Sequence, residues 1–76
     1  MEAKADYNMA LQYFNSAKEI NPDNPKIYYY LAKSYFFNSD KNNAIISVES
    51  ALKIEPDNDK FKALKIRIEE MDNNNG

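Results

Sequence analysis

Two stretches decide the fold of this chain: DYNMALQYFNSAKEINPDN at residues 6–24 and DKNNAIISVESALKIEPDN at residues 40–58. A shift of 34 residues aligns them with nine identities in nineteen positions. The identities fall mainly on small, apolar and turn-forming residues, among them Ala10 with Ala44, Ala17 with Ala51, Ile20 with Ile54, and the Pro-Asp-Asn runs that begin at Pro22 and Pro56. A period of 34 residues with this pattern indicates a repeated helix–turn–helix unit that stacks on its neighbour.

Clusters of turn residues at 21–25, 38–40 and 55–58 divide the chain into four segments. Each proline disfavours helical backbone at the residue before it, so the helices ahead of Pro22 and Pro56 should end near Ile20 and Ile54. Asn24 followed by Pro25 is typical of an N-cap with proline at the first helical position, and Asp57 or Asn58 repeats the pattern.

Apolar residues recur every three or four positions within each segment, which predicts amphipathic helices. The expected core residues are Met9, Ala10, Phe14, Ala17, Ile20, Ile27, Tyr28, Leu31, Ala32, Tyr35, Ala44, Ile45, Val48, Ala51, Leu52, Ile54, Phe61, Leu64, Ile68 and Met71. A single glycine and three prolines provide little turn chemistry for a β domain. We therefore predict an all-α fold of about four helices, arranged as antiparallel helix hairpins of an α–α superhelix.

The predicted domain covers residues 1–72, and the Asn-rich residues 73–76, which have nothing apolar to bury, are expected to form a disordered tail. At the other end, residues 4–20 read as one long helix if Ala5 and Asp6 do not interrupt it. If this helix is the second half of a repeated helix–turn–helix unit, Met9, Ala10 and Phe14 lack the first helix of that unit as a cover. We therefore expect a homo-dimer through this helix, with a weakly associating monomer as the alternative.

Composition excludes several classes of function. The chain has neither cysteine nor histidine. It therefore lacks thiolate and imidazole ligands for a metal, and it lacks the commonest general base. We expect no enzyme activity, cofactor or metal. A formal charge of −2 with a pI near 5.0 argues against nucleic acid as a partner. No apolar run approaches the roughly 20 residues that cross a bilayer, so we expect no membrane insertion and a soluble, cytoplasmic protein, although no residue identifies the compartment.

Residues 25–58 resemble one complete tetratricopeptide repeat (TPR). The residues that carry the resemblance are Tyr28, Leu31, Ala32, Tyr35, Ala44, Val48, Ala51 and Pro56. Residues 6–24 are similar to the second half of a preceding repeat, and residues 59–72 stand where a closing helix would cap the array, although Lys62 and Lys65 replace an aromatic residue and a leucine of the pattern. The alanines would let helices approach closely and receive bulky side chains from their neighbours.

The resemblance implies a protein–protein interaction module that binds a peptide or helix on the concave face of its first helices. The residues implied to face this groove are Lys26, Tyr29, Lys33, Phe36, Lys60 and Arg67, with Ala63 between the last two and with Tyr30 and Phe37 at the edges or against neighbouring helices. An aromatic floor with a basic rim suits an acidic peptide. Two alternatives remain: the lysines are ordinary solvated residues while Phe36 and Phe37 pack on the adjacent helix, or the chain is a structural repeat unit that stacks or self-associates without a ligand.

Overall fold

Four α-helices make up the fold: α1 (Ala3–Ile20), α2 (Pro25–Phe37), α3 (Lys41–Ile54) and α4 (Asp59–Glu69). The structure is a computed structural model and describes residues 3–71, with side chains from residue 7 onward. No strand occurs within these residues, so the predicted all-α fold is confirmed. The tail predicted at residues 73–76 lies outside the described residues.

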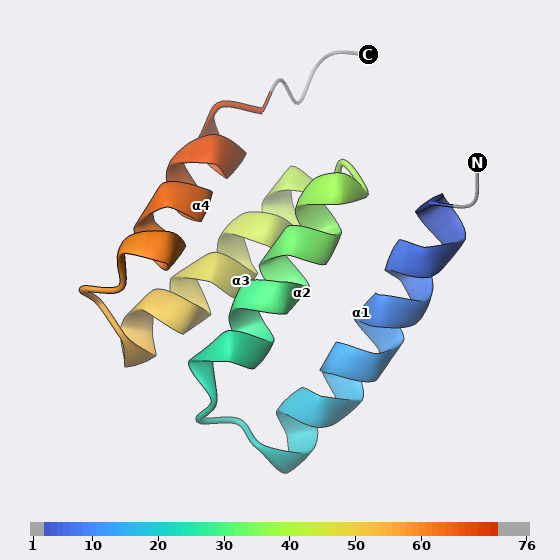
Figure 1. The fold of residues 1–76 in the computed structure, drawn as a ribbon, viewed down its shortest axis with the longest axis horizontal. Helices are drawn as coiled ribbons and strands as arrows, with labels where there is room; N and C mark the ends of the chain where they lie inside the picture. Colours follow the sequence, from blue (N-terminus) through green and yellow to red (C-terminus); the bar gives the residue numbers. More distant parts are fainter. Residues whose placement is uncertain (1–2, 72–76) are drawn as a thin grey trace.

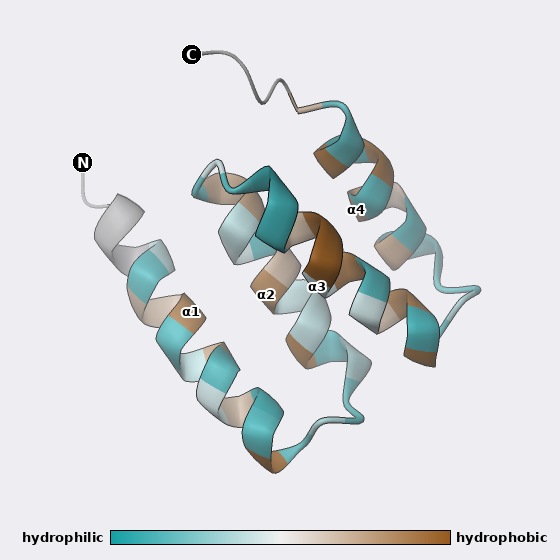
Figure 2. Ribbon diagram, turned by 180° about the vertical axis from the view of Figure 1, so that it is seen from behind, coloured by the Kyte–Doolittle hydropathy of each residue, from teal (hydrophilic) through white to brown (hydrophobic). Residues whose placement is uncertain are grey.

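Successive helices run antiparallel and pack as hairpins (Figure 1). The most extensive contact joins α2 to α3, and α3 also packs against α4. From behind, α3 lies in front of α2, while α1 and α4 flank the pair on opposite sides (Figure 2). Helix α1 contacts α2 and no other described helix. Helix α4 packs chiefly on α3 and touches α2 only slightly, which leaves a face along α2 and α4 for other contacts.

Side-chain caps start the helices where the sequence predicts. The backbone N–H of Lys26 donates to Oδ1 of Asn24 (3.0 Å), and Pro25 occupies the first turn of α2. Oδ1 of Asn58 likewise accepts from the N–H groups of Lys60 (2.9 Å) and Phe61 (3.2 Å) at the start of α4. These bonds satisfy N–H groups that have no partner inside the helix. The predicted helix ends at Ile20 and Ile54 are confirmed as well.

The turn between α2 and α3 has a left-handed residue, Ser39, with φ of 62°. The N–H of Asp40 donates to the carbonyl of Tyr35 (2.9 Å), and the N–H of Ser39 donates to that of Phe36 (3.1 Å). This pair of bonds defines a Schellman motif, which closes a helix by turning one residue into the left-handed conformation. The motif reverses the chain so that α3 can pack back on α2.

The core lies where α2, α3 and α4 meet. Ala32 of α2 and Ala44, Val48 and Ala51 of α3 are completely buried, and Phe61, Leu64 and Ile68 of α4 close over them. Half-buried side chains complete this cluster: Tyr28, Tyr29, Tyr35, Phe36, Ile45, Leu52 and Met71. Small residues at the centre with aromatic and branched residues around them are the arrangement predicted for closely approaching helices.

Three residues predicted to be in the core are exposed instead. Met9 is 69% exposed, Ile20 83% and Ile54 39%, and Ala10, Phe14 and Ala17 are only half-buried. Met9 and Ile20 lie on α1, which is covered by α2 alone, and Ile54 is the last residue of α3. Helical spacing identifies an apolar face, but burial also requires a neighbouring helix on that side.

Candidate functional site

Two adjoining hollows follow the face formed by α2 and α4, and together we call them the groove. The first hollow has a volume of about 320 Å³ and is lined by Tyr29, Lys33, Phe36, Phe37, Lys60, Ala63, Leu64 and Arg67. The second has a volume of about 410 Å³ and is lined by Lys26, Tyr29, Tyr30, Glu55, Asn58, Asp59, Lys60 and Phe61. Tyr29 and Lys60 belong to both hollows, so the two form one continuous surface.

All six residues selected from the sequence line this groove. Five of them border the first hollow, and Lys26 borders the second together with Tyr29 and Lys60. On α2 they fall at residues 26, 29, 33 and 36, a spacing that keeps side chains on one side of a helix. The 34-residue repeat relates Lys26 to Lys60 and Lys33 to Arg67, so each of the two helices contributes cations at equivalent positions.

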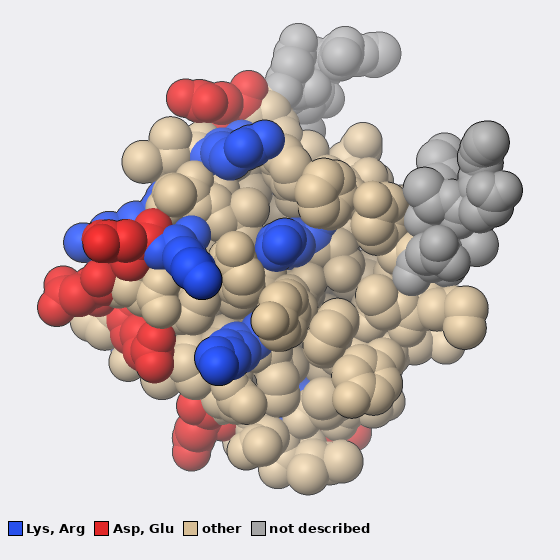
Figure 3. Space-filling model, viewed as in Figure 1, with Lys and Arg blue, Asp and Glu red and all other residues tan. Residues whose placement is uncertain are grey.

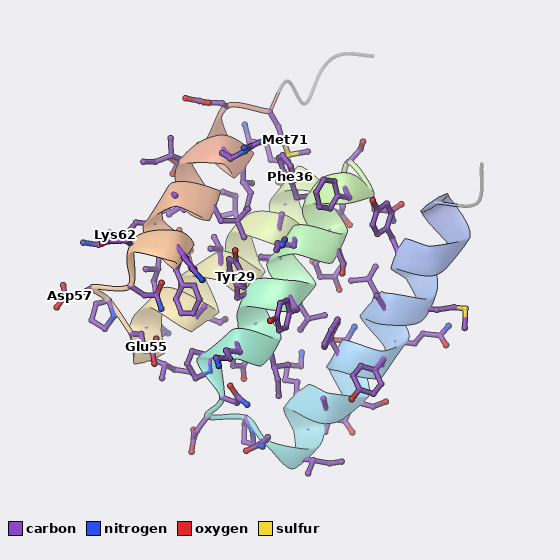
Figure 4. All side chains as sticks on the ribbon, viewed as in Figure 1. Tyr29, Phe36, Glu55, Asp57, Lys62 and Met71 are labelled. Atoms are coloured by element: carbon purple, nitrogen blue, oxygen red, sulfur yellow. The ribbon has the colours of Figure 1, made fainter. Side chains whose placement is uncertain are left out.

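Two of the cations lie against aromatic faces of the groove. Nζ of Lys33 is 5.4 Å from the ring centroid of Tyr29, and Cζ of Arg67 is 5.7 Å from that of Phe36. Such cation–π contacts hold a charged group beside an apolar surface without neutralising it. Tyr29 is fixed in turn by Phe61 of α4, whose ring centroid lies 5.1 Å away. Figure 4 shows Tyr29 and Phe36 along α2, and Lys62 pointing away from that helix.

No ion pair within the described side chains neutralises the basic residues of the first hollow. Lys65 forms the ion pairs found among residues 7–71, with Glu49 (3.4 Å) and Glu69 (3.9 Å), and it lies outside both hollows. Among the described side chains, Lys33, Lys60 and Arg67 therefore have no acidic partner beside the apolar floor. Basic groups are spread over α2 and α4 on the face seen in Figure 3.

The aromatic residues at the edge of the groove contact α1. Tyr30 stacks on Phe14 with ring centroids 5.4 Å apart, and Phe37 stacks on Tyr7 at 5.3 Å. Phe36 packs against the core cluster and also lines the first hollow. Phe36 and Phe37 thus do both: each packs on neighbouring residues, as the alternative expects, and each also lines the first hollow.

Sequence reasoning missed the acidic end of the groove. Glu55 and Asp59 line the second hollow, and Nδ2 of Asn58 donates to Oε1 of Glu55 at 2.9 Å. Asn58 therefore caps α4 with its oxygen and positions a carboxylate with its amide nitrogen. Figure 4 shows Glu55 at the loop between α3 and α4, with Asp57 farther out. The path of this loop is set by long-range packing, so no local sequence signal places Glu55 at the groove.

The described part of the chain was also searched for metal sites and for membrane-spanning helices. Residues 3–71 contain no group of acidic side chains placed to hold a metal ion. None of the four helices is long and apolar enough to cross a membrane. The groove is therefore the arrangement of side chains that we consider for function.

A comparison with protein-family models matches residues 2–75 to the model described as Regulator of microtubule dynamics protein 1-3. No curated protein and no solved structure matches the chain. The family assignment drawn from the sequence, a TPR at residues 25–58 with a half repeat at 6–24 and a capping helix at 59–72, is therefore wrong, because no TPR model matches. Stacked helix hairpins in general need small residues opposite bulky ones. A repeat of this pattern therefore does not identify one family.

Proposed function

Because the chain belongs to the family of regulator of microtubule dynamics proteins 1-3, we propose that it is a protein-interaction domain whose groove binds an acidic segment of a partner. In this proposal the partner is tubulin, either as the free dimer or in the assembled microtubule. Binding occurs between α2 and α4, and the domain carries out no reaction of its own.

One observation carries the proposal: three cations surround an aromatic and aliphatic hollow without an acidic residue among its lining side chains. Aromatic residues and arginine contribute most to affinity at protein interfaces. Cations at the rim steer an anionic partner and orient it as it docks. Tyr29 and Phe36 would contact apolar atoms of the bound segment, and Lys33, Lys60 and Arg67 would contact its carboxylates.

A second candidate function is self-association through α1, with no other ligand. The observation in its favour is the exposed apolar surface of α1, where Met9 is 69% and Tyr13 68% exposed. In this alternative the groove cations serve only as solvated surface residues. The two functions involve different helices, so substitutions separate them.

Charge reversal in the groove tests the first function. The probe is purified tubulin, as dimers and as assembled microtubules, measured by co-sedimentation and by binding to immobilised chain. We expect the 76-residue chain to bind one of these forms and the double variant Lys33→Glu, Arg67→Glu to bind at least tenfold more weakly.

The matched control is Lys53→Glu with Lys62→Glu, which makes the same change in net charge at exposed residues outside both hollows. Circular dichroism checks that both variants remain helical. Equal loss of binding in the two double variants, or no binding of tubulin by the unaltered chain, contradicts the proposal. Self-association that persists in the groove variant, together with no binding of tubulin by the unaltered chain, favours the second function instead.

A further inference from the structure

The two ends of the groove differ in charge. The first hollow is lined by Lys33, Lys60 and Arg67 and by no acidic residue. The second hollow combines Lys26 and Lys60 with two carboxylates, Glu55 and Asp59. Resting on the function proposed above, we infer that the bound segment is bipolar: it places a carboxylate in the first hollow and a cationic side chain in the second.

The carboxylates of the second hollow are available to a ligand. Glu55 and Asp59 are both exposed, and neither forms an ion pair with a described cation. The amide of Asn58 holds Oε1 of Glu55 at 2.9 Å, which fixes the carboxylate at the rim. Asp59 lies in the first turn of α4, where a carboxylate interacts favourably with the helix dipole.

The two ends of the groove therefore favour ligand groups of opposite charge. A ligand carboxylate in the first hollow meets three cations, whereas in the second hollow it meets two cations and two carboxylates, whose charges cancel. A ligand cation in the second hollow approaches the fixed oxygens of Glu55. Like charges brought together at an interface disfavour the wrong partner, so a uniformly acidic segment fits this groove less well than a bipolar one.

The geometry also sets the spacing of the two charges. The residues of α2 that line the second hollow precede those of the first by about five positions, which at 1.5 Å per residue is about 8 Å along the helix. An extended segment covers this distance in two or three residues at roughly 3.3 Å each. The ligand therefore carries its acid and its base two or three residues apart, with apolar side chains between them above Tyr29.

Three acetylated and amidated peptides test the inference. Each has two leucines between its charged residues: the first peptide carries Asp and Lys, the second Asp at both positions and the third Lys at both. Binding to the ¹⁵N-labelled 76-residue chain is followed by the amide shifts of α2 and α4. We expect the bipolar peptide to bind at least fivefold more tightly than the diacidic one, and the dibasic peptide to bind most weakly.

The double variant Glu55→Gln, Asp59→Asn removes both acids and keeps an oxygen that can accept the bond from Asn58. In this variant we expect the diacidic peptide to bind at least as tightly as the bipolar one. The control variant Asp57→Asn, Glu70→Gln removes two exposed acids outside the hollows and should leave the preference unchanged.

The outcomes distinguish the two proposals. If the peptides shift amides of the groove but the diacidic one binds as tightly as the bipolar one, the inference of a bipolar ligand is overturned and the proposed function stands. The same holds if Glu55→Gln with Asp59→Asn leaves the fivefold preference intact. If no peptide shifts the amides of α2 and α4, the groove does not bind charged segments and both proposals fall.

Discussion

Among single residues, Ser39 has the most demanding backbone conformation. Its φ of 62° lies in the left-handed region, where a side chain crowds the following carbonyl and only glycine is free of this cost. The cluster Asn38-Ser39-Asp40 marks a turn in the sequence, but it contains no glycine to indicate which residue turns left-handed.

Replacing Ser39 with glycine should therefore stabilise the fold. We expect Ser39→Gly to raise the free energy of unfolding by about 1 kcal/mol, because the Schellman bonds at this turn involve backbone atoms and remain in place. Urea denaturation monitored by circular dichroism measures the change. The control is Ser50→Gly within α3, which should destabilise the chain because glycine disfavours a helix interior. A lower stability for Ser39→Gly contradicts the reasoning.

Residue-scale prediction from the sequence succeeded for caps and partly for burial. Asn24 was identified as an N-cap and the cap of α4 was narrowed to Asp57 or Asn58, of which Asn58 is the one, because side-chain type and the neighbouring residues specify a cap locally. Buried Ala32 and Val48 followed from the helical period. Ile20 has the same spacing and the same residue type as a core position, yet it is 83% exposed, because burial depends on a neighbour that local spacing does not reveal.

At the level of helices, α1 and α3 are equivalent by the 34-residue repeat but differ in their neighbours. Helix α3 lies against α2 and α4, whereas α1 contacts α2 alone. Ala51 is accordingly completely buried, and its counterpart Ala17 is half-buried. Equivalent sequence positions thus meet different surroundings, which makes the two alanines a matched pair for testing the packing.

Substitution of this pair by leucine should have unequal effects. Ala51→Leu introduces bulk between closely packed helices and should cost roughly 1–3 kcal/mol of stability. Ala17→Leu should cost clearly less, because the larger side chain can extend past the open side of α1. Thermal and urea denaturation of both variants measure the difference. Equal losses, or an unchanged melting curve for Ala51→Leu, would show that the alanines do not set the helix spacing.

Helix boundaries and the basic part of the groove could be predicted from the sequence, whereas the acidic part could not. Lys26, Tyr29, Lys33 and Phe36 were selected because the tetratricopeptide-repeat resemblance implied that they face a groove. They line the hollows although the family differs, because their spacing keeps them on one face of α2. Glu55 and Asp59 line the second hollow together with Lys26 and Tyr29 of α2, and this arrangement results from packing between segments that are distant in the sequence. The family assignment failed because it rested on residues that pack helices together, and such residues also occur in unrelated stacked hairpins.

For the whole molecule, the open side of α1 raises the question of assembly. A chain of 76 residues buries only a small core. The exposed side chains of Met9 and Tyr13 increase the apolar surface in contact with water. The homo-dimer expected from the sequence remains a prediction, and the exposed side of α1 is the surface on which it would form.

Light scattering over a concentration series measures this assembly. We expect the average mass to rise from monomer toward dimer as concentration increases, because association removes apolar side chains of α1 from water. The variant Met9→Lys, Tyr13→Lys should stay monomeric at the same concentrations. A constant monomer mass for the unaltered chain up to high concentration would remove the dimer, and it would leave the groove proposal unaffected.

Helix α2 supplies both core and groove: Leu31 and Ala32 are buried, while Tyr29 and Phe36 line the first hollow. A segment bound there would dock only on the folded chain and would stabilise it by RT ln(1 + [L]/Kd), about 2.7 kcal/mol at a hundredfold excess over Kd. Unoccupied copies would open more often and be cleaved sooner by proteases. The abundance of the domain in a cell would then follow the supply of its partner.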